Sequence, residues 1–282
     1  MANKIMEIIK AFDIDPSSMI SQCYDGASVM SGKRGGVQKR LQDTIGVEIP
    51  FVHCFNHQLH LVVTNALNRL TFVRRMFEVC DGLYNFTRRP HIAQHYDGEK
   101  LKRLLQQRWT GHLATISTIR KCYRELLELL DTVGSHPQAS GDEVAEAIGY
   151  SHQMKSALFC VTLATVENIL LTFQPVNAML QSKTASLIMA LPLLEECTTH
   201  IKKMQDDSST FDAIWNQLDL ETAPEHASKR IQRQNSAFAD DIVACSLPIH
   251  SNQPSTSKEE LRRSYLTIVD EVLAEFATRF NE

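Results

Sequence analysis

The chain has 282 residues, of which 43% are hydrophobic and 22% charged, and this composition predicts a folded core in one large or two small domains rather than a disordered chain. Its 29 basic and 33 acidic side chains give a net charge of -4, which excludes a uniformly basic DNA-binding domain and leaves only a local basic patch for that role. The seven cysteines form no C-x-x-C pair, which favours reduced thiols in the nucleus or cytosol over a secreted disulfide scaffold.

The N-terminal part of the chain alternates between helix and strand signals. Apolar residues at helical spacing predict helices over 5–12 and 37–45, and short apolar runs at 18–24 and 48–54 predict strands. This order favours parallel strands in an α/β layer, and two strands are fewer than a parallel sheet covered on both faces usually has. We therefore expect residues 1–97 to form a partial α/β core.

After residue 97 the pattern is helical only, so we expect the fold to be mixed and mostly α, with an all-α domain over 98–282. One apolar face runs over 113–130 with Arg120 as its single polar member. Stretches rich in Gly, Pro and Ser predict flexible linkers near 133–150 and 246–258.

The most apolar stretch is 156–180, which Glu167 and Asn168 interrupt. A membrane span needs about 20 mostly apolar residues without a central charge, so this stretch predicts a buried helix, kinked or ended near Pro175, and we expect no membrane partner. An amphipathic helix is predicted over 261–280, and we interpret the lack of a capping residue after it as a sign of truncation.

An aspartate stands directly after the first predicted strand. The carboxyl ends of strands in open α/β sheets are where sites are built, and Gly26 would let the chain turn away and leave the Asp25 carboxylate exposed. The other interpretation is an ordinary turn aspartate, and these residues alone leave both open. Lys33 and Arg34 form a short basic loop that suits phosphate contact or simple solvation.

The run HCFNHQLHLV gathers Cys54, His57 and His60. The C-x-x-H spacing of Cys54 and His57 could supply half of a zinc site, but neither Cys80 nor His91 makes a convincing second half, and structural Cys and His are commoner. A nucleophilic pair of Cys54 and His57 lacks an identifiable third group, so a zinc-dependent or covalent hydrolase is the weakest interpretation.

The run QQRWTGH places Arg108 and Trp109 before a helix, with Thr110 as the expected N-cap. An exposed Arg-Trp pair could contact a phosphate and stack on a base. Alternatively, Trp109 packs into the core at the helix entry.

Taken in order, CYDGASVMSGKRGG, PFVHCFNHQLHLVV and RWTGH resemble the transposases of the hAT superfamily, the hobo and Activator type. The closing YLTIVDEVLAEFATRF resembles the helix before the last catalytic segment of that family. The resemblance covers essentially the whole chain. It implies an RNase H-like fold interrupted by a helical insertion, and metal-dependent DNA strand transfer by two aspartates and a glutamate with Mg²⁺.

By this resemblance, Asp25 matches the second aspartate and would hold Mg²⁺ weakly. Cys54 and His57 match a C-x-x-H pair that supports the active site, and Trp109, with Arg108, matches the tryptophan that stabilises DNA near the cleavage point. The first aspartate is expected upstream of residue 1 and the glutamate beyond residue 282. Since two-metal catalysis requires both ions to be clamped, we expect no independent strand transfer by this chain.

The functional expectation is a nuclear, transposase-derived fragment that retains DNA binding through Lys33, Arg34, Arg108 and Trp109. The alternative is a helical protein-interaction module in transcriptional or chromatin complexes. Protein partners and self-association are compatible with both.

Overall fold

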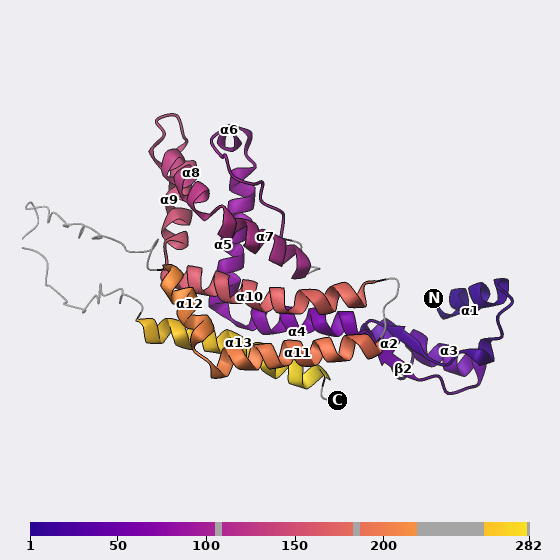
Figure 1. Ribbon diagram of the computed structural model, residues 1–282. Coiled ribbons are helices and arrows are strands. Elements are labelled where there is room, and N and C mark those ends of the chain that lie inside the picture. Colours follow the sequence, from indigo (N-terminus) through magenta and orange to yellow (C-terminus); the bar gives the residue numbers. More distant parts are fainter. Residues whose placement is uncertain (105–108, 183–186, 219–256, 281–282) are drawn as a thin grey trace, which may run out of the picture.

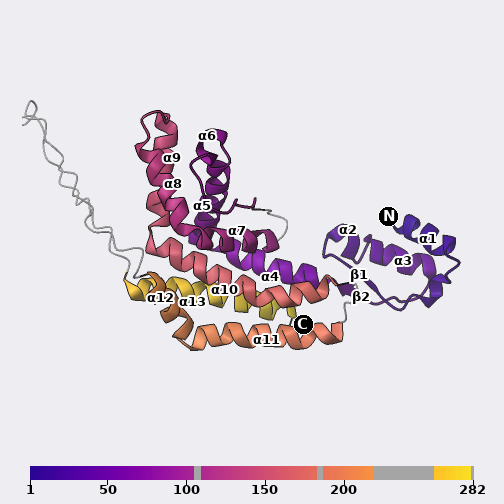
Figure 2. The same cartoon turned by 45° about the horizontal axis from the view of Figure 1, so that its top comes forward.

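The computed structural model describes residues 1–104, 109–182, 187–218 and 257–280. The described chain is mostly helical and contains one two-stranded parallel sheet. Figures 1 and 2 show a small N-terminal lobe with the sheet at one end of a larger, elongated helical body. The predicted mixed, mostly α fold is confirmed at this level.

The N-terminal lobe alternates helices with two short strands, as predicted. Its elements are α1 (Ala2–Ala11), the 3-10 turn η1 (Pro16–Ser18), β1 (Gln22–Tyr24), α2 (Ser28–Ser31), α3 (Val37–Ile45) and β2 (Phe51–His53). The strands are parallel, and Gln22, Cys23 and Tyr24 lie level with Phe51, Val52 and His53. α3 ends at Gly46, whose φ of 79° is a left-handed conformation that glycine adopts without strain. A small core of Ala2, Val37 and Leu41 holds this lobe together.

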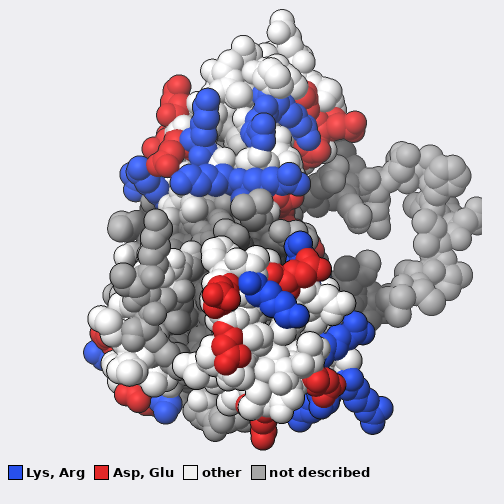
Figure 3. Space-filling view, turned by 90° about the vertical axis from the view of Figure 1, so that its right-hand side faces the viewer, with Lys and Arg blue, Asp and Glu red and all other residues white. Residues whose placement is uncertain are grey.

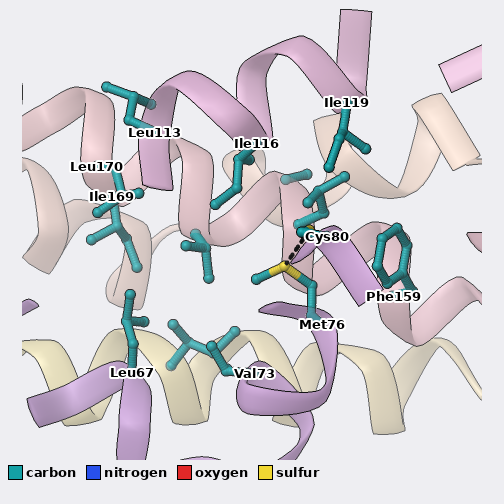
Figure 4. Close-up of a cluster of buried hydrophobic side chains, with 14 of the residues drawn as sticks. Leu67, Val73, Met76, Cys80, Leu113, Ile116, Ile119, Phe159, Ile169 and Leu170 are labelled. Atoms are coloured by element: carbon teal, nitrogen blue, oxygen red, sulfur yellow. Dashed lines mark hydrogen bonds between the residues drawn. The ribbon is translucent and has the colours of Figure 1, made fainter. Parts of the chain in front are cut away.

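The helical body is built from the remaining elements. They are α4 (Phe55–Arg69), α5 (Thr71–Thr87), α6 (Pro90–Ala93), α7 (Trp109–Lys121), α8 (Tyr123–Ser135), α9 (Gly141–Met154), α10 (Ala157–Leu180), α11 (Leu187–Asp206), α12 (Ser209–Leu218) and α13 (Lys258–Phe280). α10 is the central helix, since it contacts α4, α5, α7, α9, α11, α12 and α13. Figure 4 shows part of this core, where Met76 and Cys80 of α5 meet Ile116 and Ile119 of α7.

The apolar stretch 156–180 is a buried helix, as predicted, but it does not end at Pro175. α10 continues to Leu180 with the proline inside it. By length and composition α10 could cross a membrane, yet 61% of its most apolar window is buried inside the molecule, as in the core helix of a globular fold.

The structure changes two sequence expectations in the helical region. The linker predicted near 133–150 is a short loop at 136–140, because α9 begins at Gly141. Ser140 caps α9 by accepting a hydrogen bond from the Glu143 N–H, and the Glu143 side chain accepts one from the Ser140 N–H. The single apolar face over 113–130 belongs to two helices, α7 and α8, which are divided at Cys122. Most of the linker predicted at 246–258 lies outside the described residues, and Lys258 already belongs to α13.

The predicted domain boundary at residue 97 does not coincide with the division between the two cores. The main core contains buried residues from Leu59 of α4 through Phe276 of α13, whereas the small core ends at Leu41. α4 packs against α13 and α10 rather than on the sheet. The division therefore falls between β2 and α4, because the apolar faces of α4 and α5 are buried by helices that come later in the chain.

Candidate functional site

Asp25 lies where the sequence predicts it, immediately after β1. Its side chain is exposed at the carboxyl end of the sheet, and Oδ1 accepts a bond of 3.4 Å from the Ala27 N–H. The next residue, Gly26, lies against the imidazole of His53 at the end of β2: a Cβ at position 26 would come within 2.5 Å of that ring. The carboxylate is thus held beside the ends of both strands, and it also makes the local bond of a turn aspartate.

The end of β2 leads directly into α4 at Cys54. The Cys54 N–H donates a hydrogen bond of 2.9 Å to the carbonyl of Tyr24, so strand pairing continues up to the residue before Asp25. Cys54 is also the N-cap residue of α4. One and two turns into α4, His57 and His60 share a face, and their ring centroids lie 6.2 Å apart.

A cavity of about 340 Å³ opens between α4, α7 and the end of α10. It is lined by Cys54, Asn56, His57, His60, Trp109, Thr110, Asn177 and Gln181. Cys54 and His57 come from one predicted motif and Trp109 from another, and all three line the same cavity. Asn177 and Gln181 could not be found from the sequence, because nothing local links the end of α10 to these motifs.

The cavity wall is polar. The Gln181 side-chain amide donates a bond of 3.0 Å to Asn177, and Asn56 Oδ1 is buried without a hydrogen-bond partner among the described residues. A buried amide oxygen without a partner is costly to the folded state.

Trp109 is the first residue of α7 and only 2% exposed. The interpretation as an exposed stacking residue is therefore wrong for this structure, and the alternative of core packing at the helix entry is right. The physical reason is that the helix start faces the core between α4 and α10, where a large apolar ring gains most from burial. Thr110 is inside α7 rather than at its N-cap, and Arg108 lies outside the described residues.

Burial lowers the pKa of several histidines around the cavity. The pKa of His60 is lowered by burial and by the neighbouring His57. His112 of α7, whose ring lies 4.9 Å from that of Phe77, has its pKa lowered to about 4 by burial and then by His60. At His53, burial, His57 and Arg279 lower the pKa against the opposing effect of Asp25. These lowered pKa values favour the neutral imidazoles of His53, His60 and His112 at neutral pH.

The described residues hold no cluster of three or more His, Cys, Asp or Glu side chains arranged for a metal ion. Cys80 is buried in the core beside Met76, where burial raises the pKa of its thiol, and His91 pairs with Glu143. Neither residue lies with Cys54 and His57, so the described geometry gives no support to a zinc-dependent hydrolase.

The predicted basic loop of Lys33 and Arg34 is exposed between α2 and α3. The structure contains a second basic segment that the sequence patterns did not predict. Lys100, Lys102 and Arg103 are exposed in the stretch that leads towards α7. None of them forms an ion pair with another described residue. Thr115 of α7 donates a 2.7 Å bond to the carbonyl of Lys102, which ties this segment to the helix that begins at Trp109. Figure 3 shows Lys and Arg side chains gathered in a band across the upper part of one face. The sequence signal was the run KLKR at 100–103.

Comparison of the chain with protein-family models, curated proteins and solved structures finds no significant match.

Proposed function

We propose that the chain is a DNA-binding part of a protein derived from a hAT-superfamily transposase, similar to zinc finger MYM-type protein 1-like. The observation that carries the proposal is that Cys54, His57 and Trp109 line one cavity. Cys54 is also hydrogen bonded to Tyr24, the residue before Asp25. A parallel strand pair followed by an aspartate also fits part of an RNase H-like sheet.

The charge distribution supports contact with a nucleic-acid backbone. Lys100, Lys102 and Arg103 project from the segment tied to α7, and Lys33 and Arg34 project from the N-terminal lobe. Exposed cations that form no ion pair with another described residue can neutralise phosphates, and such contacts supply most non-specific affinity for DNA. These exposed cations reconcile DNA binding with a chain whose net charge is -4. A DNA-binding role also implies a nuclear location.

The cavity supports a role beyond backbone contact. Its volume of about 340 Å³ and its amide and imidazole groups suit a planar ligand that both stacks and donates or accepts hydrogen bonds, as an unstacked base does. We infer that phosphates lie on the basic segment while a base enters the cavity beside Trp109.

The resemblance also implies Mg²⁺, and the residues present do not fit a metal pair. Asp25 offers one exposed carboxylate, and no cluster for a metal ion is found among the described residues. One carboxylate suits one weakly held ion, whereas strand transfer by two metals needs both ions clamped. We therefore propose DNA binding without independent strand transfer by these 282 residues.

The test is the salt dependence of DNA binding. Fluorescence anisotropy with a labelled duplex that ends in a short single strand should show affinity falling steeply between about 50 and 200 mM salt. Lys100→Ala/Lys102→Ala should reduce the slope of log K against log salt by roughly 2, since each phosphate contact contributes about 1. The matched control is Lys202→Ala/Lys203→Ala, two exposed lysines of α11, a helix that does not line the cavity.

An absence of measurable affinity at low salt would contradict the proposal. It would favour the alternative, a helical module that binds proteins, which has its own observation: Ile188, Met189 and Leu191 are 80%, 57% and 45% exposed at the start of α11. Nicking of DNA with Mg²⁺ or Mn²⁺ that is lost in Asp25→Asn would instead show that the chain retains catalysis.

A further inference from the structure

We propose that a cavity of about 570 Å³ between α5, α9 and the start of α10 binds a free apolar α-amino acid. The described lining of this cavity shares no residue with that of the cavity beside Trp109. Its volume falls within the range of roughly 300–1,000 Å³ that is usual for small-molecule sites. The inference does not depend on the proposed DNA binding, because it concerns other residues and is measured on the chain without DNA.

The buried part of the cavity lining is apolar. On α5, Phe72, Met76 and Val79 follow one another at the spacing of a single helix face, and Met76 and Val79 are 2% and 4% exposed. From α10, Leu158 and Phe159 line the same cavity, and Phe159 is 6% exposed. An apolar group that enters the cavity and packs on these side chains is stabilised by leaving water.

Two opposite charges stand beside this apolar lining. Arg75 and Glu78 are exposed residues of α5 that also line the cavity, and neither forms an ion pair with another described residue. They are three residues apart, so their side chains start from neighbouring positions on the same side of the helix. An α-amino acid carries its carboxylate and its ammonium on one carbon atom. Arg75 can therefore donate hydrogen bonds to the carboxylate while Glu78 accepts them from the ammonium.

Hydroxyl groups from the neighbouring helices add to the polar side of the cavity. Tyr150 of α9 and Ser156, the N-cap residue of α10, line the cavity, and neither hydroxyl forms a hydrogen bond with another described residue. The Tyr150 ring is held in place because it packs edge-on against Phe86. Its hydroxyl lies against Gly82, where a Cβ would come within 2.5 Å of it. Both hydroxyls can donate a hydrogen bond to a bound carboxylate.

The balance of charges selects the class of ligand. Arg75 and Glu78 are the only Lys, Arg, Asp or Glu residues in the described lining of this cavity. A fatty acid would be repelled by Glu78, and a simple amine would be repelled by Arg75. A zwitterion is attracted by both groups, and its apolar side chain is placed towards the buried part of the cavity. An apolar residue inside a polypeptide lacks both charges, so the lining fits a free amino acid better than the side chain of a protein partner.

The experiment is a titration of 5-fluoro-L-tryptophan with the folded chain, followed by the line width of its ¹⁹F NMR signal. We expect a dissociation constant of about 1 mM or lower, as is usual for a ligand of about 15 heavy atoms. Unlabelled competitors then test the two charges: tryptamine lacks the carboxylate, N-acetyl-L-tryptophan lacks the ammonium, and N-acetyl-L-tryptophanamide lacks both. The first two should compete about three- to fivefold less well than L-tryptophan, since interactions between exposed charges are modest, and the third about tenfold less well.

Arg75→Met should weaken binding of L-tryptophan about three- to fivefold without weakening that of tryptamine, whereas Glu78→Gln should abolish the preference for L-tryptophan over N-acetyl-L-tryptophan. Both positions are exposed, and thermal unfolding followed by circular dichroism checks that each variant keeps its fold. The matched control is Arg74→Met, because Arg74 donates a hydrogen bond to Thr71 and lies outside the cavity lining.

Four outcomes would each overturn the proposal. They are no line broadening at millimolar concentrations, equal competition by L-tryptophan and all three competitors, stronger competition by N-acetyl-L-tryptophanamide than by L-tryptophan, and equal effects of Arg75→Met and Arg74→Met.

Discussion

Arg120 of α7 forms an ion pair with Glu167 of α10, and Arg120 also donates a hydrogen bond of 3.1 Å to Gln217 of α12. The Glu167 side chain is only 10% exposed. This pair accounts for two irregularities of the sequence: the single polar residue on the apolar face over 113–130, and the carboxylate that interrupts the apolar stretch 156–180. The Arg120 guanidinium and the Glu167 carboxylate neutralise each other in the helical body.

Removing one partner of this pair should be costly. Arg120→Met leaves the Glu167 carboxylate without its counter-charge in the core, and we expect the free energy of unfolding to fall by about 3–5 kcal/mol. Arg120→Met/Glu167→Leu should recover most of that loss, since no charge is left buried. Urea unfolding followed by circular dichroism measures both variants. A double variant as unstable as the single one would show that the pair contributes more than mutual neutralisation.

The contact between Gly26 and His53 makes a prediction for the sheet edge. Gly26→Ala places a Cβ within 2.5 Å of the His53 ring, so the ring or the Asp25 turn must move. We expect a loss of about 1–3 kcal/mol, the range for overpacking a close contact. Gly35→Ala is the matched control, because a Cβ there meets nothing within 4 Å.

Hydrogen exchange of the amides in β1 and β2 locates this effect. Exchange should accelerate in Gly26→Ala and stay unchanged in Gly35→Ala. Equal protection in both variants would mean that the His53 ring moves aside at no cost.

The lowered pKa of His112 predicts a pH-dependent stability. The folded-state pKa is about 4 and the ordinary value is 6.5, so the unfolded chain binds a proton first as the pH falls. The contribution of His112 to the free energy of unfolding is therefore complete above pH 6.5. It is lost progressively between pH 6.5 and 4, by up to about 3 kcal/mol.

His112→Leu should flatten that part of the stability profile, whereas His152→Leu, at an exposed position of α9, should leave the profile unchanged. Urea unfolding at pH 7, 6, 5 and 4 makes the measurement. A wild-type profile with no slope attributable to His112 would refute the assignment.

A substitution at the cavity edge can test DNA binding without changing the stability of the fold. Gln181 is exposed at the C-cap of α10 and lines the cavity, so Gln181→Ala removes a hydrogen-bonding group without opening the core. We expect DNA affinity to fall about three- to tenfold, in line with the roughly 0.5–1.5 kcal/mol of one hydrogen bond, while the melting temperature stays constant. Gln138→Ala, at an exposed position in the loop before α9, is the control. Equal affinity in both variants would show that the cavity is not part of the proposed DNA-binding surface.

Local patterns were enough to predict α1, α3, α10 and α13, and the two parallel strands. Apolar spacing reports the helix or strand period directly, and the order of elements constrains how two strands can pair. Asp25 was placed at the end of a strand for the same reason. α9 was missed although Ser140 and Glu143 form a capping box, because the Gly and Pro nearby were interpreted as a loop.

Which helix faces pack against one another depends on residues that are far apart in the chain. No local pattern predicts that Trp109 is buried or that Cys54 and Gln181 line one cavity. The same holds for the packing of α4 on α13. Residue spacing specifies which side of a helix is apolar, and that information lies within a few turns. Which apolar sides bury one another is settled by packing over the whole chain, and the cavity exists only as a result of that packing.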